Sequence, residues 1–271
     1  MTAISKTAEA KLAEVFGDRL RTDRVERKAY SFDIGAMPKL VRPFVPTGVA
    51  GAVVRPRTED EIVALMSVAC SEGLHIVPRG WATSGYGGVL PSEGAVVVDM
   101  SGMRDVVGVN IKEMTVTVEA AAVWEQIERE LEKDGLALRL YPSSSPSSSA
   151  AGWLAQGGSG FGSYEYGTFK ENVVSARLVR PTGEVAEVEG RDLLDQVADA
   201  EGITGIITEL TVRIRPLERE VHKAIAFDDV RAMAEALEAV SEEYLPIWSI
   251  TFLNPESVRL KKQLPHRHAH P

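Results

Sequence analysis

The sequence predicts an α+β fold, because stretches typical of strands and of helices follow one another without strict alternation. Residues 95–100 (AVVVDM) and 114–119 (MTVTVE) are rich in β-branched residues, as strands are, whereas apolar residues recur at helical spacing after Thr58. A doubly wound sheet would require a regular strand–helix repeat, and no internal repeat is present. The 271 residues, 44% of them hydrophobic, suffice for one large or two small domains.

The expected strands share short apolar or alternating patterns bounded by turn residues. In chain order they are residues 50–55, 74–77, 95–100, 114–119, 173–179, 184–188 and 203–214. Two helices are expected between them. The first begins at Thr58, which forms a capping-box pattern with Glu61, and stops at Gly73; the second contains Trp124 and ends near Gly135.

Few elements are expected near the two ends of the chain. Residues 10–16 predict a short amphipathic helix, and residues 21–33 a polar connection. Toward the C-terminus, a strand over 222–227, a helix after Asp228 or Asp229 and a strand over 247–253 are expected.

Composition excludes several classes of protein. The chain has 30 Lys+Arg against 39 Asp+Glu, a net charge of -9, which argues against a nucleic-acid binder. The single cysteine, Cys70, excludes a disulfide framework and an iron–sulfur cluster held by this chain alone. We expect it to be a buried thiol in a reducing compartment, the cytoplasm. No stretch approaches the ~18 apolar residues of a membrane span, and no secretory signal is evident.

Two glycine-rich segments could bring backbone N–H groups close to a phosphate. They are residues 78–88 (PRGWATSGYGG) and 156–167 (QGGSGFGSYEYG), and neither contains the Rossmann G-x-G-x-x-G or the P-loop pattern. The serine-rich run before the second segment could be a flexible linker. Because aromatic residues such as Trp153 and Tyr164 are interleaved through residues 141–167, an ordered, ligand-contacting loop is favoured.

Other candidate sites are weaker. His266, His268 and His270 alternate, so that in an extended chain they would share one side, as metal ligands could. They lie at the extreme terminus without a carboxylate nearby, and no metal site is expected. Ser159 fails the G-x-S-x-G pattern of a nucleophile elbow, because Phe161 takes the last position.

Four segments in order resemble the FAD-binding domain of the vanillyl-alcohol oxidase / p-cresol methylhydroxylase (PCMH) family, and within it the flavin subunits of glycolate oxidase and D-lactate dehydrogenase. They are residues 53–88, which include the family's pyrophosphate loop, residues 141–160, which match its second flavin loop, residues 166–185, which match a strand and hairpin, and residues 201–210, EGITGIITEL. The likeness covers about residues 30–216.

The resemblance implies a two-subdomain PCMH-type FAD-binding fold with the start of a truncated α+β cap domain. The expected domains are residues 1–45, an N-terminal helix and connection, residues 46–218, which bind FAD, and residues 219–271, a partial cap and tail. The implied cofactor-binding residues are Pro78, Arg79, Gly80, Trp81, Ala82, Thr83, Ser84, Ser143, Ser144, Ser149, Gly152, Gln156, Gly157, Gly158, Ser159, Glu201, Gly202, Ile203, Thr204, Gly205, Ile206 and Ile207.

The sequence departs from the family pattern at Trp81 and Ala82, where glycines are usual. Members with covalent flavin carry a His or Cys in the first loop, and residues 79–88 contain neither, so non-covalent FAD is expected.

The implied function is an FAD-dependent dehydrogenase component that oxidises a small hydroxy acid, such as glycolate or lactate, by hydride transfer to FAD. The electrons then pass to a partner, and a protein partner that completes the site or accepts the electrons is expected. The alternatives are an oxygen-dependent oxidase of an alcohol or sugar, a non-catalytic FAD-binding or electron-relay subunit, and a fragment of a longer gene product. No catalytic residue is assigned.

Overall fold

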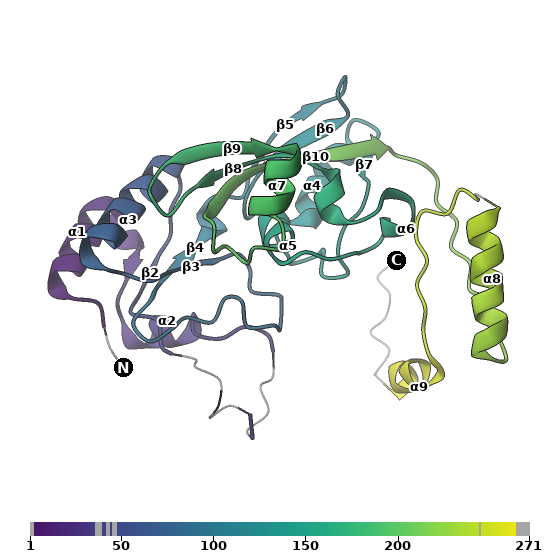
Figure 1. Cartoon of the computed structure of the whole chain (residues 1–271), viewed down its shortest axis with the longest axis horizontal. Helices are drawn as coiled ribbons and strands as arrows, with labels where there is room; N and C mark the ends of the chain where they lie inside the picture. Colours follow the sequence, from purple (N-terminus) through teal and green to yellow (C-terminus); the bar gives the residue numbers. More distant parts are fainter. Residues whose placement is uncertain (1–2, 36–39, 42–43, 45–47, 244, 264–271) are drawn as a thin grey trace.

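Two sheets form the centre of the computed structural model, which describes residues 3–35, 40–41, 44, 48–243 and 245–263 (Figure 1). The first sheet has the order β1-β2-β4-β3 and pairs β2, β4 and β3 in parallel. Its strands are β1 (Leu20–Arg21), β2 (Ala52–Val54), β3 (Ile76–Arg79) and β4 (Val96–Asp99). Three helices belong to this half of the fold, α1 (Lys6–Phe16), α2 (Arg24–Ala29) and α3 (Glu59–Glu72).

The second sheet is antiparallel, with the order β5-β6-β10-β8-β9 and β7 paired to the end of β10. Its strands are β5 (Val106–Asn110), β6 (Thr115–Glu119), β7 (Leu136–Leu138), β8 (Val173–Val179), β9 (Val185–Glu189) and β10 (Ile206–Pro216). The helices of this half are α4 (Trp124–Glu132), α5 (Ala150–Gln156), α6 (Ser163–Tyr166) and α7 (Gly190–Gln196). Short 3-10 turns are Gly17–Arg19, Met100–Gly102 and Phe169–Asn172. One continuous apolar core joins both halves.

Helix α3 begins and ends where the sequence predicts. The Thr58 hydroxyl accepts a hydrogen bond from the N–H of Glu61, and Gly73 ends the helix in the left-handed region at φ 63°. The Glu61 carboxylate pairs with Arg19 at 2.5 Å, which lowers the pKa of Glu61. The ion pair between Glu61 and Arg19 therefore connects α3 to the chain before β1.

Glu59, in the first turn of α3, joins this helix to the second sheet. Its carboxylate accepts two hydrogen bonds from Arg177 of β8, at 2.7 and 2.8 Å, and one from Thr208 of β10 at 2.9 Å. The hydrogen bonds from Arg177 lower the pKa of Glu59. These hydrogen bonds fix α3 and the second sheet relative to each other.

All seven strands predicted before residue 216 are present, with ends shifted by a few residues. The prediction of a polar connection over 21–33 was wrong, because this segment contains the end of β1 and all of α2. Helix α2 has no apolar repeat to reveal it, and it begins where the Asp23 carboxylate accepts the N–H groups of Val25 and Glu26. The expectation that Cys70 is buried was also wrong, since its side chain is exposed.

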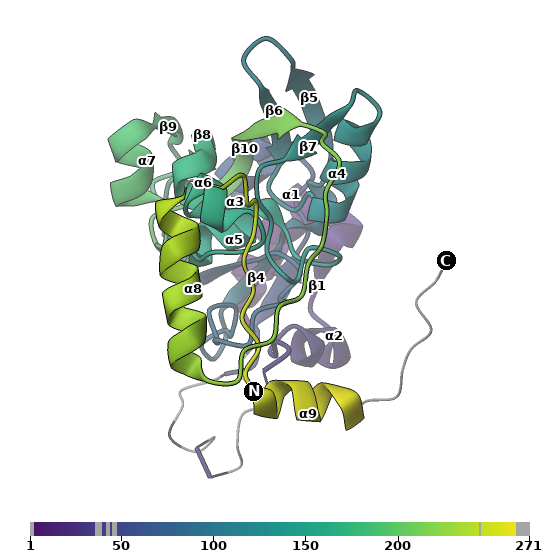
Figure 2. The same ribbon diagram turned by 90° about the vertical axis from the view of Figure 1, so that its right-hand side faces the viewer.

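The C-terminal segment differs from its prediction. Helix α8 (Val230–Glu242) begins at the predicted Asp229, but residues 222–227 and 247–253 form no strands within the described part of the chain. Both stretches run extended beside α8, on one side of the two sheets, and α9 (Pro255–Gln263) follows (Figure 2). A strand needs a ladder of backbone hydrogen bonds to a neighbour, and neither stretch forms one among the described residues. His266, His268 and His270 lie outside the described residues.

Trp248 attaches this segment to the second half of the fold. Its indole N–H donates to the carbonyl of Arg139 at 2.7 Å, and its ring lies 4.9 Å from the guanidinium of Arg215 and 5.6 Å from the ring of Tyr141. Gly162 leaves room for it, because a Cβ there would meet the indole nitrogen at 2.6 Å.

Trp248→Ala should therefore release residues 245–254 while the two sheets stay folded. The lost hydrogen bond and cation–π contact are together worth about 1.5 kcal/mol, so local opening becomes about tenfold more frequent. Hydrogen exchange of the backbone amides measures this opening. Phe252→Ala, at an exposed side chain, is the matched control and should leave exchange unchanged. Equal exchange in both variants would show that Trp248 does not anchor the segment.

Candidate cofactor site

A groove of about 660 Å³ lies where the carboxyl ends of β3 and β4 meet the start of β10. Three loops line it: residues 78–89 after β3, residues 142–159 around α5, and residues 201–207 before β10. All but two of the cofactor-binding residues predicted from the sequence lie along this groove. The exceptions are Ile203, which is exposed, and Thr204.

The first loop presents backbone donors. Within the described residues, the N–H groups of Trp81, Ala82, Thr83 and Ser84 donate to no acceptor. Ala82 lies in the left-handed region at φ 53°, a conformation that favours glycine. Consecutive unpaired N–H groups around such a residue can bind an anion.

The second loop packs directly against the first. The Ser149 hydroxyl lies between Gly80 and Gly152, where added Cβ atoms would meet its oxygen at 2.5 and 2.8 Å. Gln156, at the end of α5, donates to the Ser84 hydroxyl at 2.8 Å. These contacts bring the two predicted phosphate-binding loops together, although about 70 residues of chain separate them.

The third loop closes against both. Gly202 lies against Pro78, since a Cβ there would meet the proline ring at 2.7 Å, and the carboxylate of Glu201 lies over Gly88. The N–H of Glu201 donates to the carbonyl of Ala155 at 2.8 Å. Glu201, like Ala82, has a positive φ, of 53°. Such strained residues gather at functional sites when surrounding contacts hold them.

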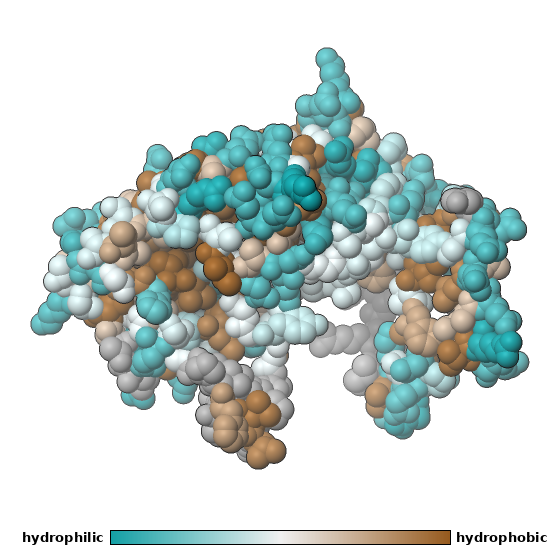
Figure 3. Space-filling model, in the orientation of Figure 1, coloured by the Kyte–Doolittle hydropathy of each residue, from teal (hydrophilic) through white to brown (hydrophobic). Residues whose placement is uncertain are grey.

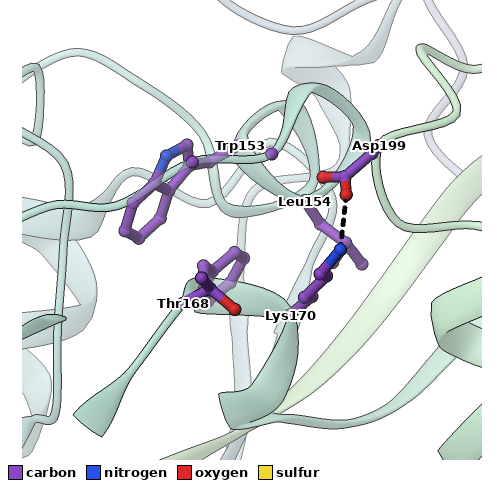
Figure 4. A pocket seen from close by; sticks show the side chains of 8 residues that line it. Trp153, Leu154, Thr168, Lys170 and Asp199 are labelled. Atoms are coloured by element: carbon purple, nitrogen blue, oxygen red, sulfur yellow. Dashed lines mark hydrogen bonds and ion pairs between the residues drawn. The ribbon is translucent and has the colours of Figure 1, made fainter.

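A second, smaller pocket of about 100 Å³ lies behind the groove and shares Trp153, Gly157 and Gly158 with it (Figure 4). An ion pair of 2.7 Å between Lys170 and Asp199 borders this pocket. The Asp199 side chain lies against Gly157, where a Cβ would approach it to 1.9 Å. The pair therefore supports the wall of the groove at Gly157 from outside.

Trp81 replaces a glycine of the family pattern without blocking the groove. Its indole N–H donates to the carbonyl of Ala121 at 2.9 Å, and the ring remains 39% exposed. The side chain is thus fixed at the border of the groove.

The charge of the lining is sparse. Arg79 and Glu201 are the charged side chains among the lining residues that the structure describes. Burial lowers the pKa of Arg79, which means that its charge is partly shielded from water. No three His, Cys, Asp or Glu side chains gather as a metal site requires within the described ranges.

Ser148 is a lining residue that the sequence did not single out. It is 7% exposed, and its hydroxyl has no hydrogen-bond partner among the described residues. A buried hydroxyl without a partner costs free energy, so a bound molecule with an acceptor would satisfy it. Its position in a run of six serines and a proline offers no signal that separates it from its neighbours.

Comparison with known proteins identifies the kind of molecule that such a groove holds. The FAD binding domain family matches residues 50–189, which contain the first two loops. D-lactate dehydrogenase [cytochrome] from Arabidopsis thaliana mitochondria is 29% identical over 265 residues, 94% of this chain and 45% of that protein. Glycolate oxidase subunit GlcD from Bacillus subtilis is 26% identical over 244 residues, 86% of this chain and 50% of that protein.

Solved structures show the same fold. An alkyldihydroxyacetonephosphate synthase superimposes with a TM-score of 0.76 at 26% identity, over 89% of this chain and 46% of that one. The BBE-like 1 protein of Physcomitrella patens gives a TM-score of 0.66 at 23% identity, over 78% of this chain and 45% of that one. The PCMH-type fold predicted from the sequence is thereby confirmed. The chain spans about half the length of these relatives, and no helix in its described ranges is long and apolar enough to cross a bilayer.

The residues of the groove fit FAD. Unpaired N–H groups and the Ser148 hydroxyl suit the oxygens of a pyrophosphate, and glycines at the loop contacts leave the space that a flat ligand needs. The residues that would hold it are those of the three loops.

Gly80→Ala should weaken FAD binding and destabilise the protein by about 1–3 kcal/mol, because the new Cβ meets the Ser149 oxygen. Ser149→Ala in the same chain removes that oxygen, leaving the nearest atom at 3.6 Å, and should restore stability. Thermal unfolding and FAD titration of both variants test this. Gly108→Ala, at a site with nothing within 4 Å, is the control. Additive losses in the double variant would show that the two loops do not touch as described.

Ser148→Ala should act in opposite directions on stability and on binding. The apoprotein should be as stable as the wild type or more so, because an unpaired buried hydroxyl is removed, while FAD affinity falls about tenfold through the loss of one hydrogen bond. Unfolding of the apoprotein and FAD titration measure the two effects. Ser147→Ala, at an exposed serine of the same run that does not line the groove, is the control. A less stable apoprotein with unchanged affinity would contradict a role for Ser148 in binding.

Proposed function

The chain belongs to the FAD binding domain family, and from this premise we propose that it is the flavin-binding component of a dehydrogenase that oxidises a small 2-hydroxy acid such as glycolate or lactate. The groove where the three loops meet carries this proposal, together with the similarity to D-lactate dehydrogenase and glycolate oxidase proteins. FAD bound there would accept a hydride from the carbon that bears the hydroxyl group.

We propose that each loop has its own part in holding FAD without a covalent bond. The N–H groups of residues 81–84 and the hydroxyls of Ser148 and Ser149 would bind the phosphates, with Arg79 as the cation. Gly157, Gly158 and residues 205–207 would border the ring system. The lining residues that the structure describes include neither His nor Cys, the side chains that form covalent flavin links, in support of non-covalent binding.

The lining also supports the need for a partner. Oxidation of a hydroxy acid requires a base for the hydroxyl proton, and among its described lining residues the groove offers one carboxylate, Glu201, and no imidazole or amine. The Glu201 carboxylate is turned onto Gly88. We therefore propose that a protein partner, or a continuation of the same gene product, supplies the base and receives the electrons.

An apolar surface on the C-terminal segment supports such a partner. Val221, Ile225 and Phe252 are more than half exposed, and Figure 3 shows apolar atoms gathered over α8 and the chain beside it. Exposed apolar patches of this kind mark surfaces that other polypeptides cover. The domain boundaries at residues 45 and 218 are part of the same proposal, since they place this surface in a partial cap.

The similarity to alkyldihydroxyacetonephosphate synthase favours a second candidate, a synthase component that uses the same groove.

The cytoplasm remains the proposed location, supported by the free, exposed Cys70, although the Arabidopsis relative is mitochondrial by name.

Anaerobic mixing of the FAD-loaded protein with D-lactate or glycolate tests the dehydrogenase directly. The visible flavin band should bleach when the partner that supplies the base is present, and L-lactate is the stereochemical control. In air, hydrogen peroxide in place of transfer to an added acceptor would show an oxidase. A flavin that no hydroxy acid reduces, with or without partner proteins, would contradict the dehydrogenase and favour the synthase or a relay subunit.

A further inference from the structure

Arg79 is the cationic side chain of the groove, and the chain before β2 holds it in place. Its guanidinium donates to the carbonyl of Phe32 at 2.8 Å and to that of Tyr30 at 3.4 Å. It also lies over the ring of Tyr30, 5.2 Å from the centroid. Tyr30 follows α2, a helix that the sequence did not reveal, and it does not itself line the groove.

Tyr30 is itself held by hydrogen bonds to Asp99 and Arg55. Its hydroxyl donates to the Asp99 carboxylate at 2.6 Å and accepts from Arg55 at 3.0 Å, and Arg55 also donates to Asp99 at 2.8 Å. Burial would raise the pKa of Asp99, but hydrogen bonds from Tyr30 and Arg55 outweigh it and lower that pKa. Asp99 stays ionised, and it stands opposite Arg79 in the pairing of β3 with β4.

The same segment holds the far end of the first loop. The carboxylate of Asp33 accepts from the N–H of Gly87 at 3.0 Å, and the backbones of Gly35 and Gly85 are in contact. Residues 30–35 therefore contact the first loop at both of its ends, at Arg79 and at Gly87.

We propose that Tyr30 and Asp99 are positioning residues that hold the Arg79 guanidinium ready for the phosphate groups of bound FAD. This rests on the location of FAD proposed above. A free arginine side chain loses rotamer freedom when it binds a phosphate, and one that neighbours already fix loses less. The unpaired N–H groups of the first loop are uncharged donors. Among the described lining residues, Arg79 is therefore the positive charge that a pyrophosphate in the groove would meet.

Comparison of two ligands distinguishes a loss of Arg79 positioning from a general loss of protein stability. FAD carries the pyrophosphate and riboflavin carries no phosphate, so we compare the dissociation constants of both for Arg79→Met, Tyr30→Phe and Asp99→Asn. Arg79→Met should weaken FAD about 10- to 100-fold, the range of one lost hydrogen bond to a charged group, and leave riboflavin unchanged. Tyr30→Phe and Asp99→Asn should weaken FAD by a smaller factor, again without an effect on riboflavin.

Glu61→Gln is the matched control, because it breaks the pair with Arg19, another arginine–carboxylate contact at the edge of the first sheet but outside the groove. It should lower stability without changing the ratio of FAD to riboflavin affinity. In the Arg79→Met background, Tyr30→Phe should add nothing further, because its effect acts through Arg79.

Equal losses of FAD and riboflavin affinity in Tyr30→Phe and Asp99→Asn would overturn the proposal, as would additive losses in the double variant. The readout is binding and not turnover. A protein that binds FAD in this way but oxidises no hydroxy acid would therefore contradict the proposed function alone.

Discussion

The site depends on one constraint, the close contact of three loops at glycine residues. Ser149 fits between Gly80 and Gly152, Gly202 fits against Pro78, and an added Cβ at any of these glycines would force neighbouring atoms apart. Because the loops come from both sheets, this contact also fixes how the two halves of the fold face each other. The groove is the space left at that junction.

Backbone strain gathers at the same junction. Ala82, Asp199 and Glu201 have positive φ values, and each such residue costs about 1–3 kcal/mol unless its surroundings hold it. The hydrogen bonds of Asp199 and Glu201 to the carbonyls of Leu154 and Ala155 hold two of them. A protein that kept these conformations without a ligand to bind would lose stability for no purpose, so the strain agrees with a binding site.

The sequence predicted local features better than distant contacts. Thr58 and Gly73 marked the ends of α3 because caps act through the nearest backbone groups. The glycine and serine loops were found because their composition and order are distinctive. Helix α2 was missed because it has no apolar repeat, and the contact of Tyr30 with Asp99 was missed because 69 positions separate the two residues. The prediction of strands near the C-terminus was wrong because an alternating apolar pattern does not by itself provide a partner strand.

The central claim is that one groove, formed by three loops, binds FAD. Hydrogen exchange of the protein with and without FAD tests it most directly, because unpaired N–H groups in residues 81–84 should become protected when phosphates accept from them. Exchange should slow on FAD binding in residues 79–88, 143–159 and 201–207 together. Protection confined to one loop, or located away from all three, would contradict it.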